Sequence, residues 1–169
     1  NHILYVEDDA AMRKLFGLLQ NSILKPYTFS FAETLEQARI ELVLNPKKYT
    51  VLVCDYYLPD GEAKDLFPLP VELPVIVLTA TYDVNLAVQL MKLGVDDFVV
   101  KDKDSQFLKL MPEKMKSVIE KKAAEAEAAQ QERRFRDLFA NSNDIIQYLD
   151  PDGKIIQANP PLSEILEYS

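Results

Sequence analysis

Residues 51–61 read VLVCDYYLPDG, a short apolar run that ends in the carboxylate of Asp55 and is followed by a Pro-Asp-Gly turn signal. The run does not alternate with polar residues, which is typical of a strand buried on both faces of a parallel sheet. The chain opens in the same way, since residues 3–6 read ILYV and run directly into Glu7, Asp8 and Asp9. In open α/β sheets, ligands bind at the carboxyl ends of the strands, so both groups of carboxylates are candidates for one site.

Similar apolar runs recur along the chain and alternate with segments of helical spacing. Further strand-like runs cover residues 28–32, 75–78 and 98–100. Apolar residues at helical spacing occur within residues 12–19, 35–43 and 86–93, and the last segment stops at Gly94. Three prolines between residues 68 and 74 leave room for only a short helix around residues 62–67. This alternation predicts an α/β fold with a doubly wound parallel sheet.

Composition excludes several classes of protein. The chain has 169 residues, a net charge of -8 and 48% hydrophobic residues, enough for one full core. The acidic balance argues against direct binding of nucleic acid, and no apolar stretch approaches the roughly 20 residues that span a bilayer. The single cysteine, Cys54, cannot form an intrachain disulfide and reads as a small core residue. We therefore expect a cytoplasmic protein without a membrane segment in this part of the chain.

The C-terminal third changes in character. From Pro112 onward, Ala, Glu, Lys, Gln and Arg dominate for about two dozen residues, which predicts a long helix with an apolar start at Met115, Val118 and Ile119. This helix could pair with its copy in a homodimer or remain a single solvated helix. Residues 144–149 and 154–158 then predict a hairpin around an Asp-Gly turn, and Asn159 precedes a helix running toward Leu166.

The strand ends predict a chemical site. Glu7, Asp8 and Asp55 would meet if the first and third strands are neighbours, and such a cluster is tolerable when a hard cation such as Mg2+ lies among the oxygens. Alternatively, Asp8 or Asp9 caps the following helix. Thr79 and Lys101 end two further strands. A carboxylate, a metal, a hydroxyl and an ammonium are the groups that phosphoryl transfer requires.

Four segments, ILYVEDD, VLVCDYYLPDG, PVIVLTA and LGVDDFVVK, occur in this order between residues 3 and 101. By these motifs, residues 1–111 resemble a receiver domain of the response regulators of two-component signalling. The resemblance implies a flavodoxin-like five-stranded sheet in the order 2-1-3-4-5. It also implies that Asp55 is the phosphoacceptor, taking a phosphoryl group from a histidine kinase or a phosphotransfer protein.

The same resemblance implies roles for the residues around Asp55. Glu7, Asp8, Asp55 and the backbone carbonyl of Tyr57 would hold Mg2+. Lys101 would contact the phosphoryl group, Thr79 would turn its hydroxyl toward it, and Phe98 would be the aromatic residue that rotates inward on activation. Such a domain assists both the gain and the loss of its phosphoryl group without being a dedicated enzyme.

Two positions depart from the pattern. Glu7 stands where the family often has aspartate, and Asp102 stands where proline commonly follows the lysine, often with a cis bond. Asp102 and Asp104 could therefore pair with Lys101 at rest. Two other functions stay open, a phosphorylation-independent interaction module with this fold and a hydrolase with an aspartyl nucleophile. The hydrolases commonly carry a second acid where Tyr57 stands.

The domain organisation follows from these segments. We expect a receiver domain over residues 1–111 and a helical linker, with coiled-coil potential, over residues 112–134. Residues 135–169, FRDLFANSNDIIQYLDPDGKIIQANPPLSEILEYS, resemble the first part of a PAS sensory domain. The linker would relay the switch to this region, and a homodimer would form through either segment. The sole histidine, His2, lies in the first strand and is no candidate phosphodonor, so a kinase or cyclase output would lie beyond Ser169.

Overall fold

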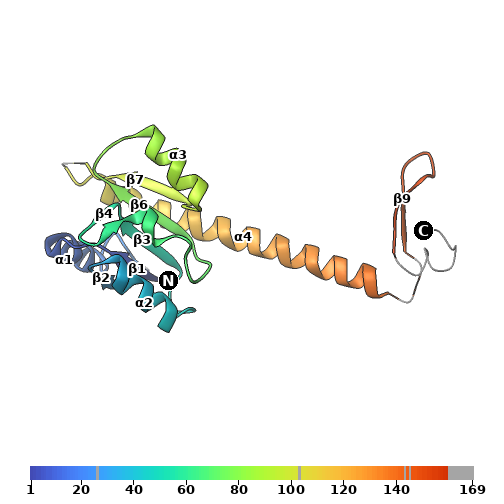
Figure 1. The fold of residues 1–169 in the computed structure, drawn as a ribbon, viewed down its shortest axis with the longest axis horizontal. Helices are drawn as coiled ribbons and strands as arrows, with labels where there is room; N and C mark the ends of the chain where they lie inside the picture. Colours follow the sequence, from blue (N-terminus) through green and yellow to red (C-terminus); the bar gives the residue numbers. More distant parts are fainter. Residues whose placement is uncertain (26, 103, 143, 145, 160–169) are drawn as a thin grey trace. The chain divides into compact units, whose positions relative to one another are not determined.

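The computed structural model describes residues 1–159 except residues 26, 103, 143 and 145. The chain divides into two compact units, Asn1–Lys122 and Ala123–Ser169. Helix α4 (Phe107–Asn141) is continuous across this division (Figure 1). The helix therefore belongs to both units.

The first unit is built on a five-stranded parallel sheet. Its strands are β1 (His2–Val6), β2 (Thr28–Ala32), β3 (Val51–Asp55), β6 (Val75–Thr79) and β7 (Asp97–Val100). They lie in the order β2-β1-β3-β6-β7, and every neighbouring pair is parallel. Because β4 and β5 form a separate ribbon, this is the 2-1-3-4-5 order of the flavodoxin-like fold, as predicted.

The segment after β3 is compact and nearly free of helix. Strands β4 (Tyr57–Leu58) and β5 (Gly61–Glu62) form a small antiparallel ribbon, followed by the 3-10 helix η1 (Ala63–Leu66). Gly61 has a φ of 150°, and a Cβ atom there would lie 2.9 Å from an oxygen of Asp65. The turn therefore requires glycine. The prediction of only a short helix at this place is confirmed.

Helices cover both faces of the sheet. Side chains from α1 (Ala10–Leu19) and α4 share one core cluster, whereas those from α2 (Leu35–Leu44), η1 and α3 (Val84–Leu93) share the other. Alternate residues of the central strands contribute to opposite clusters, as the period of a strand requires. Val51 and Val53 face α1 and α4, while Leu52 and Cys54 face α2. The central strands β1, β3 and β6 are thus buried on both sides, which explains their unalternating apolar sequences.

Helix α4 begins at Phe107, five residues before the expected start at Pro112. Phe107, Leu108 and Met111 are buried in the core, and this apolar burial outweighs the hydrogen bond that a proline inside a helix forgoes. Met115 and Val118 are buried in the same core, so the apolar start of the helix packs on its own sheet. Among the described residues, no helix combines the length and apolar character needed to cross a bilayer.

The turn after β3 also fixes the first turn of α2. The carboxylate of Asp60 accepts hydrogen bonds from the backbone N–H groups of Leu35 (2.9 Å) and Glu36 (3.0 Å), while Thr34 caps the N–H of Gln37 at 3.2 Å. These are groups that a helix leaves without partners of its own. Loss of solvent acts to raise the pKa of Asp60, but the backbone hydrogen bonds outweigh it and hold the pKa below its ordinary value.

Replacing Asp60 by alanine should lower the free energy of unfolding by about 1 kcal/mol, because two N–H groups lose their acceptor. Urea unfolding followed by circular dichroism measures this difference. The contribution should be complete above the ordinary aspartate pKa of 3.8 and should disappear at lower pH, as the pH falls through the lowered pKa of the folded state. An exposed control, Asp152→Ala, should change stability less, and equal losses for both variants would contradict the capping role.

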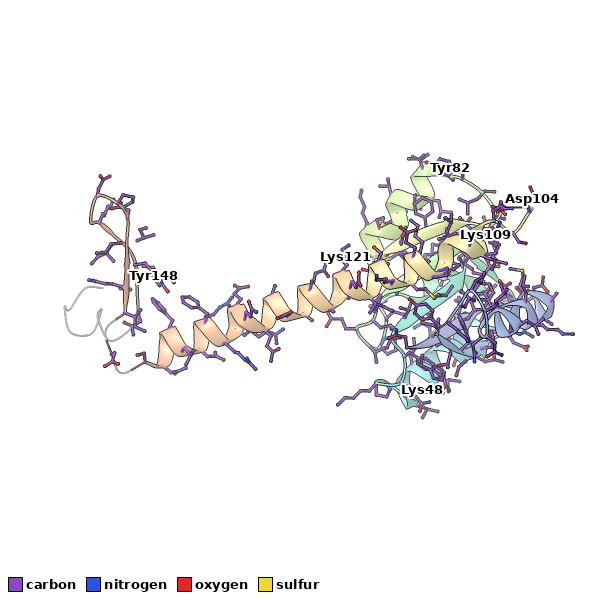
Figure 2. All side chains as sticks on the ribbon, turned by 180° about the vertical axis from the view of Figure 1, so that it is seen from behind. Lys48, Tyr82, Asp104, Lys109, Lys121 and Tyr148 are labelled. Atoms are coloured by element: carbon purple, nitrogen blue, oxygen red, sulfur yellow. The ribbon has the colours of Figure 1, made fainter. Side chains whose placement is uncertain are left out.

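The second unit contains a β-hairpin of β8 (Gln147–Leu149) and β9 (Ile155–Ala158). Its turn is the predicted one, because Asp150 accepts from the N–H groups of Asp152 and Lys154 and Gly153 has a φ of 83°. Tyr148, labelled in Figure 2, contacts the rings of Phe135 and Phe139 at 6.1 Å between centroids. The helix expected from Asn159 toward Leu166 lies outside the described residues.

Candidate functional site

The parallel register brings four predicted site residues to one edge of the sheet. Glu7 follows β1 directly, Asp55 ends β3, Thr79 ends β6, and Lys101 follows β7 directly. Asp55 pairs with the residue before Thr79, and Thr79 pairs with the residue before Lys101. These side chains therefore start from neighbouring strand ends, as predicted.

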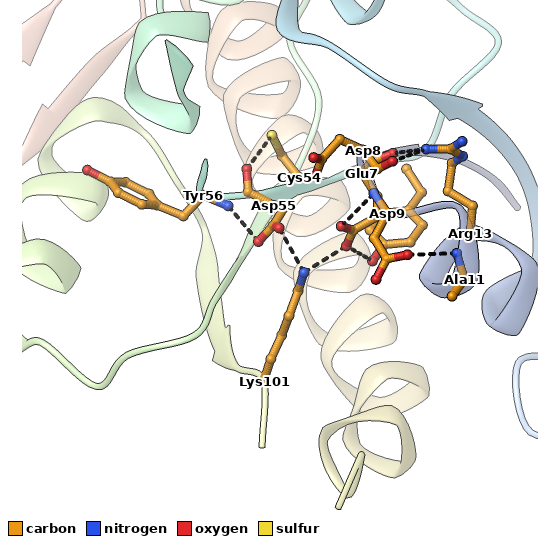
Figure 3. A network of polar contacts seen from close by, with 10 residues as sticks. Glu7, Asp8, Asp9, Ala11, Arg13, Cys54, Asp55, Tyr56 and Lys101 are labelled. Carbon is orange, nitrogen blue, oxygen red and sulfur yellow. Dashed lines mark hydrogen bonds and ion pairs between the residues drawn. The ribbon is translucent and has the colours of Figure 1, made fainter. Parts of the chain in front are cut away.

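Three carboxylates form the centre of the site. One oxygen each of Glu7, Asp8 and Asp55 lies within 4.8 Å of the others. The ammonium of Lys101 points between two of them, with Nζ 2.7 Å from Oε2 of Glu7 and 2.8 Å from Oδ2 of Asp55 (Figure 3). Three negative charges and one positive charge leave the group with a net charge of -2. The lysine therefore compensates the cluster only in part.

The loop after β1 is held by contacts that leave the Asp8 carboxylate within the cluster. Asp9 is the N-cap of α1 and accepts from the N–H of Ala11 at 2.7 Å. Arg13 donates to the backbone carbonyls of Glu7 and Asp8 at 2.7 and 2.8 Å (Figure 3). The capping role that the sequence left open between the two aspartates thus belongs to Asp9.

Both oxygens of Asp55 have partners. The N–H of Tyr56 donates to Oδ1 at 2.9 Å, and Lys101 pairs with Oδ2. Tyr57 opens β4 two residues after Asp55, and the residue is 60% exposed. The Tyr57 carbonyl, predicted as a further ligand, thus belongs to a residue two positions after Asp55, and this residue is largely exposed.

Burial is the largest influence on the pKa values of both Asp55 and Lys101. Burial raises the pKa of Asp55, and the nearby Glu7 charge adds to this, although hydrogen bonding and attraction to Lys101 act in the opposite direction. Burial acts to lower the pKa of Lys101, but its contacts with Asp55 and Glu7 prevail and raise it. The lysine therefore stays charged. The ionised form of Asp55 is disfavoured by burial and by the Glu7 charge, and a further cation nearby would stabilise it.

Thr79 and Phe98 have surroundings other than the Asp55 carboxylate. The buried Thr79 hydroxyl exchanges hydrogen bonds of 3.3 Å with the backbone of Thr81. Phe98 is half-buried and lines a groove of about 500 Å³ together with residues of α3 and the exposed Tyr82. The hydroxyl expected to switch is thus bonded to Thr81, and the ring expected to switch borders this groove.

Asp102 does not pair with Lys101. Its carboxylate accepts from the N–H of Gln106 at 2.6 Å, just before α4. The cis peptide bond of the described residues is Phe67–Pro68, so the bond from Lys101 to Asp102 is trans. The aspartate in place of proline thus contributes to the start of α4 instead of holding the lysine.

Sequence reasoning missed two residues that shape the site, Tyr5 and Arg13. The Tyr5 hydroxyl donates to Oε2 of Glu7 at 2.6 Å. The available signal was the spacing of two, because residues i and i+2 of a strand lie on one face. Arg13 carried no comparable signal, since its targets are backbone carbonyls.

Comparisons with known proteins agree with this arrangement. A family model described as the response regulator receiver domain matches residues 3–113. The methanogenesis regulatory protein FilR1 of Methanothrix harundinacea (strain 6Ac) is 32% identical over 108 residues, covering 61% of this chain and 24% of that protein. The chain thus spans about a quarter of the length of this curated relative.

Solved structures show the same fold. The non-phosphorylated HemR receiver domain from Leptospira biflexa is 28% identical, with a TM-score of 0.57 over 70% of this chain and 93% of that one. A response regulator receiver domain protein from Clostridium thermocellum is 18% identical, with a TM-score of 0.60 over 73% and 97%. The first unit has the architecture and acidic edge of a signal receiver. The chain belongs to the response regulator receiver domain family of two-component signalling.

The donor set of the cluster fits a hard divalent cation. All three groups offer carboxylate oxygens, the kind of ligand that Mg2+ prefers. The net charge of -2 equals the charge that such an ion would neutralise, and Asp8 is exposed, so the cluster is open to solvent. Glu7, Asp8 and Asp55 are therefore the residues that could hold the ion.

The role of Lys101 in compensating the cluster has a measurable consequence. The Lys101→Met variant should lose about 3 kcal/mol of unfolding free energy in EDTA, because the buried Glu7 carboxylate loses its cationic partner. Millimolar Mg2+ should restore part of this loss. Urea unfolding with and without Mg2+ measures both effects.

Lys114→Met is the matched control, since Lys114 pairs with Asp97 at 2.9 Å in a more exposed position away from the cluster. This variant should lose less than about 1 kcal/mol and should show no Mg2+-dependent recovery beyond that of the wild type. Equal behaviour of the two variants would show that Lys101 is an ordinary surface lysine.

Proposed function

We propose that Asp55 accepts a phosphoryl group from a phosphohistidine of a histidine kinase or a phosphotransfer protein. The observation that carries this proposal is the placement of Asp55 at the edge of the sheet, between a carboxylate cluster and the Lys101 ammonium. In the transfer, an oxygen of Asp55 forms a bond to phosphorus while the P–N bond of the donor breaks. The electron pair of that bond stays on the imidazole nitrogen.

The residues around Asp55 would act mainly by positioning and by balancing charge. Lys101 already contacts Asp55, so a short movement away from Glu7 would place its ammonium on the new phosphoryl oxygens. The Thr79 hydroxyl would exchange its long bonds with Thr81 for a phosphoryl oxygen. Mg2+ bound by Glu7, Asp8, Asp55 and the carbonyl of Tyr57 would supply further neutralisation of oxygen charge.

Switching would follow from these new contacts. A phosphoryl group adds oxygens that Thr79 and Lys101 can bind only in the modified state. Phe98 lies at the groove beside α3, so its inward rotation into the space left by Thr79 would remodel that surface. Phosphorylation of Asp55 would thus change the surface formed by Phe98 and α3, which a partner can bind.

Incubation with acetyl phosphate and Mg2+ should add the mass of one phosphoryl group to the wild-type chain and none to the Asp55→Asn variant. Intact-mass spectrometry measures this, and EDTA should abolish the gain. Asp60→Asn, which changes a carboxylate of the same turn outside the cluster, should still be labelled.

Two results would replace the proposal. No mass increase in the folded wild type would favour a phosphorylation-independent interaction module with this fold. Sustained turnover of phosphate esters that depends on Asp55 would favour a hydrolase. An exposed tyrosine at position 57, where such hydrolases commonly carry an acid, makes the second result less expected.

We also propose that α4 relays the switch to the second unit. Two ion pairs connect the helix to β7 and to the residue before it: Lys114 to Asp97 at 2.9 Å and Lys122 to Asp96 at 3.5 Å. The other oxygen of Asp96 accepts from the N–H of Val75, at the start of the strand that carries Thr79. A shift of either strand would therefore reach α4.

Residues 135–169 would then be the first part of a PAS-like sensor or output region. The hairpin with its Asp-Gly turn supports this proposal, as does the buried Asn159. Asn159 bonds the backbone of Ile146 and Asp144 at 2.9 and 2.8 Å, which closes the base of the hairpin. A structure of the longer protein tests the proposal, and a domain of another class after Ser169 would end it.

The part of α4 after Lys122 would pair with a second copy of the chain. Side chains of residues 123–128 are exposed, and Ala123 and Ala126 offer a small-residue seam. Ala126→Glu should weaken self-association at least about tenfold in sedimentation equilibrium, because two carboxylates would meet where small side chains allow close packing.

Ala128→Glu, on the opposite side of the helix, is the control and should leave self-association unchanged. Beryllium fluoride with Mg2+, which mimics the phosphoryl group, should shift the association constant of the wild type. A wild-type chain that sediments as a monomer with and without this mimic would refute pairing through α4.

A further inference from the structure

Tyr5 is a fully buried tyrosine whose hydroxyl reaches the carboxylate cluster. It is the fourth residue of β1, and its hydroxyl lies 2.6 Å from Oε2 of Glu7. The ring packs against Phe16, with 4.3 Å between centroids, and Phe31, with 6.1 Å. Because the ring is enclosed by neighbours, the hydroxyl has a fixed position.

The two oxygens of Glu7 have unequal surroundings. Oε2 accepts from both the Tyr5 hydroxyl and the Lys101 ammonium, at 2.6 and 2.7 Å. Among the described residues, Oε1 accepts one long hydrogen bond of 3.4 Å, from the N–H of Asp9. Two strong donors therefore hold one oxygen, and Oε1 is the one left with capacity for a further ligand.

We infer that Tyr5 is a positioning residue for the cation site: its hydroxyl fixes the Glu7 side chain so that Oε1 is available to Mg2+. This inference rests on the cation site of the proposed function. Glutamate has one more rotatable bond than aspartate, so a free Glu7 carboxylate would sample more positions. The bond from Tyr5 removes that freedom and lets a glutamate serve at this strand end.

The hydrogen bond from Tyr5 to Glu7 should persist on phosphorylation, whereas the contact from Lys101 should not. Lys101 reaches Glu7 through a long flexible side chain, and in the proposed function it moves to the phosphoryl group. The Glu7 side chain is only 2% exposed, so an oxygen left without a donor would be costly. Tyr5 cannot leave its packed position, and its hydroxyl keeps Oε2 partnered in both states of the lysine.

Calorimetric titration of the full chain with Mg2+ tests this role. Tyr5→Phe keeps the ring and removes only the hydroxyl, and it should weaken Mg2+ binding about tenfold, as loss of a hydrogen bond to a metal ligand typically does. The control is Tyr27→Phe, another buried tyrosine, whose hydroxyl donates to the carbonyl of Pro112 at 3.3 Å. It should leave Mg2+ affinity unchanged.

A second background separates positioning from general damage to the core. In Glu7→Asp the side chain is one methylene shorter and should no longer reach the Tyr5 hydroxyl, so adding Tyr5→Phe should cause no further loss of Mg2+ affinity. An equal loss in both backgrounds, or unchanged affinity in Tyr5→Phe alone, would overturn the inference. If the wild-type chain binds no Mg2+, both the proposed cation site and this inference are wrong. If Tyr5→Phe binds Mg2+ as the wild type does and Asp55 is still labelled by acetyl phosphate, only this inference is wrong.

Discussion

The Lys101 ammonium between Glu7 and Asp55 is the interaction on which the site depends. Parallel strands bring carboxylates to one edge of the sheet, and without a positive charge between them these groups would repel one another in a partly buried place. Because one lysine compensates only part of the charge, the resting site stays attractive to a divalent cation. The same lysine is within reach of any phosphoryl group formed on Asp55, so one side chain would link the resting and modified states.

Much of this arrangement follows from local sequence. Short strand-like runs, most of them unalternating and apolar, predicted all five strands. The carboxylate, hydroxyl and ammonium at their ends predicted which side chains meet, because parallel strands align their carboxyl ends. Partners of those side chains were harder to predict. Pairing of Lys101 with Glu7 depends on side-chain reach across strands, which no local pattern records. The bond from Tyr5 to Glu7 follows a spacing of two along β1, but that spacing alone does not tell that the two side chains bond. The early start of α4 was missed because Pro112 suggested a boundary, whereas burial of Phe107 and Met111 decides it.

The packing of α4 connects the site with the rest of the chain. Its first turns complete the core of the receiver, and its ion pairs with Asp96 and Asp97 attach it to the strands that carry Phe98 and Thr79. The helix then continues without a break into the second unit. Because the first turns of α4 pack in the core, a rearrangement of that core would also displace the helix. This packing is the basis for proposing α4 as the route of the signal.

A crystal structure of the full chain with Mg2+ and beryllium fluoride tests the central claim most directly. The account predicts a cation bound by oxygens of Glu7, Asp8 and Asp55, beryllium fluoride on Asp55, and the Lys101 ammonium moved from Glu7 onto the fluoride. Tyr5 should still donate to Glu7. A cluster without a cation, with Lys101 still bridging Glu7 and Asp55 in the presence of saturating ligands, would contradict it.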